Sequence, residues 1–120
     1  MTISFEGISL LFDLSKFELI DWDDDYDEEG NLVHCLRHGV TEKVVAEVLR
    51  ERPVEIKLSV RSAEFAIVGP NCEMSKMWTL LFDISYKRGD WLRPVTGWSA
   101  TQGQIKAWQQ ATRLPWRNKL

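Results

Sequence analysis

Hydrophobic residues recur along the chain at two spacings, and these spacings divide it into strands and helices. Residues 54–60 alternate strictly, with Val54, Ile56, Leu58 and Val60 on one side and polar residues between them, which is typical of a half-buried strand. Comparable strand-like runs cover residues 3–14, 16–22, 64–68, 77–85 and 91–96. The connections are short enough for antiparallel pairing. Pro94 predicts either an edge position for the last strand or an unpaired site for its nitrogen.

Three segments show helical spacing instead. Residues 30–37 place apolar side chains on one side, and Gly39 suits the left-handed residue that follows a helix. Thr41 predicts the cap of a second helix over residues 42–52. Residues 101–112 form a third amphipathic stretch. We therefore expect the α+β class: an antiparallel sheet with two helices in the amino-terminal half and one at the carboxyl end.

Length and composition favour one folded domain. The chain has 120 residues, of which 44% are hydrophobic, enough for a single core. Its apolar runs are too short to span a membrane, and its amino end lacks the pattern of a secretion signal. We therefore predict a cytoplasmic protein without a membrane partner. Cys35 and Cys72 are expected to be buried thiols.

Charge is distributed unevenly, which the net charge of −3 conceals. Residues 21–29 hold seven carboxylates and no cation, whereas from Gly30 onward 14 Lys and Arg stand against 8 Asp and Glu, a balance of +6. The acidic run lacks the glycine and closing glutamate of a calcium loop, so we interpret it as a solvated loop. A basic body attracts phosphate when its acidic patch faces elsewhere.

Two segments, His34–Thr41 and Leu92–Thr101, carry the most specific pattern. The resemblance is to the BrnT-type toxins of bacterial toxin–antitoxin pairs. It is carried by the Arg37-His38-Gly39-Val40 helix end and the Val95–Thr101 strand end, together with the Trp22-Asp23 start and the Glu47-Val48-Leu49 run. The resemblance covers roughly residues 21–108. It implies a RelE-like fold, RNA cleavage without metal or cofactor, and an antitoxin protein that blocks the toxin.

Within a single domain of residues 1–120, the resemblance assigns residues 30–112 to a BrnT-like body. Residues 1–20 are then an added strand or hairpin, and residues 21–29 the acidic loop. Trp98 stands near the end of the last strand, where the family usually has a basic residue. His34 stands where these toxins often have asparagine.

The two histidines, His34 and His38, are the candidate catalytic residues. Cleavage of RNA through its own 2′-hydroxyl needs a base and an acid, and histidine serves as either near neutral pH. The alternative is structural: His38 caps the carboxyl end of its helix, and His34 is a half-buried ring. Two histidines four residues apart are also half of a metal site. Cys35 replaces the glutamate of helical zinc proteases, and we predict no metal.

Cations and an aromatic side chain complete the candidate site. Alternation places Arg93 on the face opposite Leu92, where its fork suits a transition-state phosphate; the alternative is a surface cation stacked on tryptophan. Arg37 and Arg61 are secondary RNA-binding candidates or solvated charges. Trp98 is a candidate for base stacking or for anchoring a protein partner.

Two functions of different classes follow. The first is a BrnT-like ribonuclease toxin that an antitoxin neutralises. The second is a non-catalytic protein of the same fold that binds protein or nucleic acid, for instance by strand addition or as a homodimer. The first function makes the chain an endoribonuclease whose partner is RNA.

Overall fold

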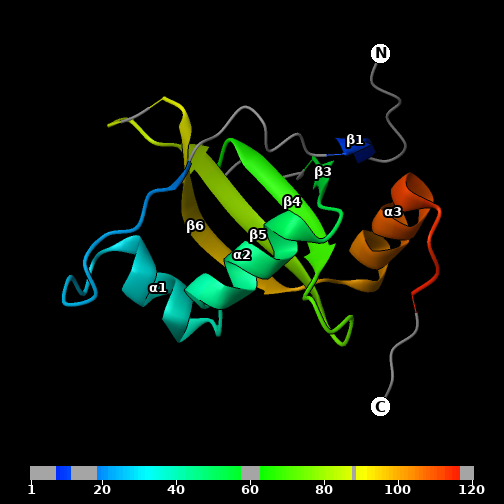
Figure 1. Cartoon of the computed structure of the whole chain (residues 1–120), viewed down its shortest axis with the longest axis horizontal. Helices are drawn as coiled ribbons and strands as arrows, with labels where there is room; N and C mark the ends of the chain where they lie inside the picture. Colours follow the sequence, from blue (N-terminus) through cyan, green and yellow to red (C-terminus); the bar gives the residue numbers. More distant parts are fainter. Residues whose placement is uncertain (1–7, 12–18, 58–62, 88, 117–120) are drawn as a thin grey trace.

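The computed structural model describes residues 8–11, 19–57, 63–87 and 89–116, and it confirms the α+β class. A sheet lies between helices on its two faces (Figure 1). In chain order the elements are β1 Ile8–Leu11, β2 Leu19–Ile20, α1 Asn31–Arg37, α2 Glu42–Arg50, β3 Val54–Ile56, β4 Phe65–Pro70, β5 Met77–Ile84, β6 Trp91–Ser99 and α3 Gln102–Thr112.

Within the described residues, the sheet has six strands in the order β1-β3-β4-β5-β6-β2. All neighbours pair antiparallel except β2 and β6, which are parallel, with Leu19 opposite Trp91. The prediction of a wholly antiparallel sheet is therefore wrong at this edge. Two helices and three strands separate β2 from β6 in sequence, and a parallel pair needs such a long connection.

The strands β1 and β2 lie at opposite edges of the sheet, so in the described part of residues 1–20 they do not pair with each other as a hairpin. β1 extends the sheet beside β3, and β2 extends it beside β6. The predicted continuation of β3 through Leu58 and Val60 lies outside the described residues.

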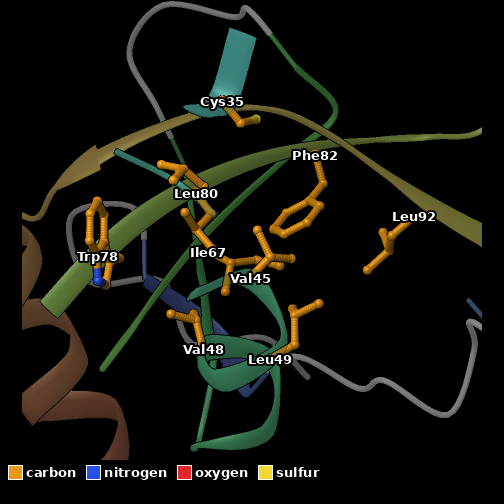
Figure 2. Close-up of a cluster of buried hydrophobic side chains, with 10 residues drawn as sticks. Cys35, Val45, Val48, Leu49, Ile67, Trp78, Leu80, Phe82 and Leu92 are labelled. Atoms are coloured by element: carbon orange, nitrogen blue, oxygen red, sulfur yellow. The ribbon is translucent and has the colours of Figure 1, made fainter. Parts of the chain in front are cut away.

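Each face of the sheet buries its own apolar cluster. Beneath α1 and α2 lie side chains from β4, β5 and β6, including Ile67, Phe82 and Leu92 (Figure 2). On the opposite face the fully buried Trp108 of α3 packs with Val54, Val68 and Leu81. Burial on both faces explains why β4 and β5 have nearly continuous apolar sequences instead of alternating ones.

Helix α1 ends in a Schellman motif, as Gly39 predicts. The Val40 N–H donates to the Cys35 carbonyl at 2.8 Å, and the Gly39 N–H donates to the Leu36 carbonyl at 3.0 Å. Gly39 has a φ of 78°, in the left-handed region that this motif requires. The chain then turns sharply into α2, where the Thr41 hydroxyl accepts the Val44 N–H at 3.1 Å, the cap that the sequence predicts.

Pro94 lies at a bulge in β6. Thr96 is opposite Leu81, whereas Pro94 is opposite Phe82, so Val95 is left without a partner of its own. A bulge tolerates proline inside a sheet, which corresponds to the second of the two sequence alternatives. On the other side of β6, the Pro94 carbonyl accepts a hydrogen bond from the Asn31 side-chain amide at 2.9 Å.

The cysteines differ in exposure. Cys35, on the inner side of α1, is fully buried, but Cys72 is exposed, so the prediction of a buried thiol is wrong for Cys72. It lies in the turn between β4 and β5, which is built mainly from polar residues, and its side chain stays at the surface. Among the described helices, none has the length and apolar character to cross a membrane.

Candidate functional site

The two segments that carry the family resemblance meet where α1 ends on β6. Val40, only 1% exposed, packs onto Gly97. A Cβ atom on Gly97 would lie 3.0 Å from Val40 Cγ2 and 2.6 Å from Leu80 Cδ2. The absence of a side chain at position 97 therefore lets the end of α1 approach the sheet, and this contact fixes the orientation of the helix.

The outer surface of α1 presents His34, Arg37 and His38, all of them exposed. The imidazole rings of the two histidines are 4.8 Å apart between centroids and tilted by 55°. Arg37 lies three residues after His34 and so shares this surface. Cys35, between them in sequence, points into the core (Figure 2). We call these three exposed residues the α1 histidine surface; all three are sequence-predicted candidates.

Arg93 is held by carboxylates of its own chain. Its two terminal nitrogens donate to the two oxygens of Asp23 at 2.6 and 3.0 Å, and one of them lies 3.4 Å from Asp21. The hydrogen bond from Arg93 lowers the pKa of Asp23, and the same bond raises the pKa of Arg93. Two carboxylates face one guanidinium, so the arginine offers little net positive charge to a phosphate.

Polar partners complete this arrangement, which we call the Asp–Arg cluster: Asp21, Asp23, Asn31, Ser85 and Arg93. Asp23 caps α1, because its carboxylate accepts the Asn31 N–H at 2.9 Å. The Asn31 side chain in turn accepts the Asp23 N–H at 2.8 Å and donates to the Asp21 carbonyl at 2.9 Å. The Ser85 hydroxyl donates to Asp21 at 2.6 Å. The cluster thereby ties the start of α1 to β2, β5 and β6.

Sequence reasoning missed the role of Asp21 and Asp23, which it placed within the exposed acidic loop. Asp21 is only 5% exposed, and the exposed part of the run is residues 24–29. A usable signal was present: Asp21 and Asp23 continue the period-two alternation of β2 on either side of Trp22.

The structure separates Arg93 from His38. Arg93 contacts the start of α1 through Asp23, whereas His38 is the residue that ends this helix. His38 is seven positions after Asn31, which corresponds to roughly 10 Å along a helix axis. Leu92 belongs to the cluster beneath α1 and α2, and alternation turns Arg93 to the opposite face, as predicted. Arg93 makes no described contact with either histidine.

The remaining candidates lie elsewhere. Trp98 is 36% exposed, and its indole nitrogen lies 3.4 Å from the Gln104 side chain of α3, on the face of the sheet opposite α1. Arg61 lies outside the described residues. Within the described ranges, no group of three or more His, Cys, Asp or Glu side chains could hold a metal ion.

Comparison of the chain with protein-family models, with curated proteins and with solved structures finds no match.

Proposed function

We propose that the protein is a BrnT-like toxin that cleaves RNA without a metal ion in the cytoplasm and is neutralised by an antitoxin protein. The observation that carries this proposal is the α1 histidine surface, where two exposed imidazoles lie 4.8 Å apart beside an exposed arginine. The surface is held in place by the Schellman turn at one end and by the Asp–Arg cluster at the other.

The residues of this surface match the requirements of the reaction. One imidazole removes the proton of the 2′-hydroxyl, and the other protonates the leaving 5′-oxygen. A cation must also offset the negative charge that develops on the phosphate oxygens. Arg37 supplies that charge in place of Arg93, whose fork is occupied by Asp23. RNA would therefore lie across the outer surface of α1.

Expression in a bacterial host tests this function. Induction without an antitoxin should arrest growth, and the His38→Ala variant should relieve the arrest because one of the two proton-transfer groups is missing. Equal amounts of soluble protein must be confirmed for both chains. Lys106→Ala, an exposed cation on α3, is the matched control and should remain toxic. Growth unaffected by the unaltered protein would contradict the proposal.

A second candidate function, a non-catalytic binding module, is favoured by two observations. Arg93 is neutralised by carboxylates, and Trp98 is partly exposed where the family has a cation. An exposed tryptophan is a frequent anchor for a protein partner. This function predicts stable overexpression without growth arrest and a discrete dimer or complex that Trp98→Ala weakens.

A further inference from the structure

The histidine pair has a geometry that suits a second ligand. We propose that His34 and His38 together form an open binding site for one transition-metal ion of the zinc, nickel or copper class. The site is distinct in kind from the metal-independent chemistry proposed above, and its existence does not depend on RNA cleavage.

The spacing of the rings supports this site. A metal ion bound by two imidazoles at about 2.0–2.1 Å, with an angle between the bonds of about 90–109°, places the ring centroids roughly 4.5–5.2 Å apart. The observed separation is 4.8 Å. Both rings project from one helical turn and both are exposed, so an ion could reach them without rearrangement of the backbone.

The donor set determines the class of ion. Imidazole nitrogen suits zinc, copper and nickel, whereas calcium and magnesium prefer oxygen ligands. Cys35, the nearest thiol in sequence, is fully buried on the inner side of the helix, so its sulfur does not reach an ion bound at the exposed rings. The two histidines leave the other coordination positions to water or to a bound molecule, unlike the closed shell of a structural zinc site.

Metal binding would also affect the proposed activity, a consequence that depends on the proposed function. A ring nitrogen that binds a metal ion has no free electron pair with which to accept the 2′-hydroxyl proton. The ion would thus act as a reversible inhibitor of RNA cleavage.

Calorimetric titration tests the site directly. Protein without an affinity tag, treated with EDTA and then dialysed, is titrated with nickel chloride, and one ion should bind per chain. Loss of even an outer-shell partner costs about 10–100-fold in metal affinity, so His34→Gln and His38→Gln should each weaken binding about tenfold or more. Arg37→Gln is the matched control on the same surface and should bind at least as well as the unaltered chain.

Two outcomes would overturn the proposal: no binding of nickel, zinc or copper, or equal binding by the unaltered chain and both histidine variants. The second would place the ion elsewhere, for instance on the acidic loop. All three substituted side chains are exposed, and circular dichroism would verify that the variants fold. RNA cleavage measured separately distinguishes the two proposals: metal binding without cleavage rejects only the ribonuclease, and cleavage without metal binding rejects only the metal site.

Discussion

At the scale of single residues, Arg93 has a structural role. Its guanidinium donates to Asp23 at 2.6 and 3.0 Å and lies 3.4 Å from Asp21. Its side chain is 23% exposed, and the two carboxylates are 7% and 15% exposed. Removal of one partner from an ion pair with so little solvent around it lowers the free energy of unfolding, because the remaining charge stays partly buried. Arg93 therefore stabilises the start of α1, and its hydrogen-bond donors to Asp23 are not available to a phosphate group.

Replacing Arg93 should destabilise the protein. We expect Arg93→Gln to lower the free energy of unfolding by about 2 kcal/mol at pH 7, since two carboxylates lose their charged hydrogen-bond donor. Chemical denaturation of both chains measures the difference. Arg113→Gln, an exposed cation in the turn after α3, is the control and should change stability by less than about 0.5 kcal/mol.

The effect of Arg93 should also depend on pH. Asp23 has a lowered pKa in the folded chain, so its contribution is fully present above the ordinary aspartate pKa of about 4. The contribution is lost as the pH falls through the lowered folded-state value. The stability difference between the unaltered chain and Arg93→Gln should therefore shrink below about pH 4. A difference that stays constant from pH 7 to pH 2 would show that Asp23 does not mediate it.

Among the elements, α1 depends most on its two ends. It has only seven residues, too few to be stable alone, and its apolar side is formed by little more than Leu32 and Cys35. The Asp23 cap holds its start, and the Schellman turn with Val40 on Gly97 holds its end. The spacing of His34 and His38 is a consequence of these anchors.

Loss of the turn should be detectable in the stability of the chain. Gly39→Ala should destabilise it by about 1–2 kcal/mol, because alanine disfavours the left-handed φ of 78°. Space is not the reason, since a Cβ there would lie 3.9 Å from Trp78. Gly103→Ala, inside α3 with its nearest neighbour at 4.0 Å, is the matched control and should be neutral or stabilising by up to about 1 kcal/mol. Equal effects of the two substitutions on thermal unfolding would argue against the role of the turn.

Local spacing predicts most of these elements, because a helix turn, a cap and a strand alternation each involve residues close in sequence. The His34–His38 pair, Gly39 and the Thr41 cap are of this kind. The parallel pairing of β2 with β6 is not of this kind. The apolar pattern of Leu19 and Ile20 does not indicate which edge of the sheet these residues join. The partners of Arg93 are separated from it by about 70 residues and stand in a run of seven carboxylates. Alternation sets Asp21 and Asp23 apart from the loop, but it does not indicate that they pair with Arg93.

At the scale of the whole molecule, the negatively charged acidic loop lies next to the α1 histidine surface, which carries the cation Arg37. The exposed carboxylates of residues 24–29 lie in the loop that leads directly into α1 (Figure 1). Their negative charge repels a phosphate backbone from the start of the helix. RNA bound on this surface should therefore approach the end that carries Arg37 and His38, which is the end of α1 farther from the loop.

The most direct test of the account is cleavage of a labelled single-stranded RNA by the purified protein in the presence of EDTA. We predict cleavage by the unaltered chain, products that end in a 2′,3′-cyclic phosphate, and a rate at least about 100-fold lower for His38→Gln, because a proton-transfer group commonly contributes 10²-fold or more. No cleavage, or cleavage that persists at the same rate in the His38→Gln and His34→Gln variants, would contradict the claim that the α1 histidine surface is a ribonuclease site.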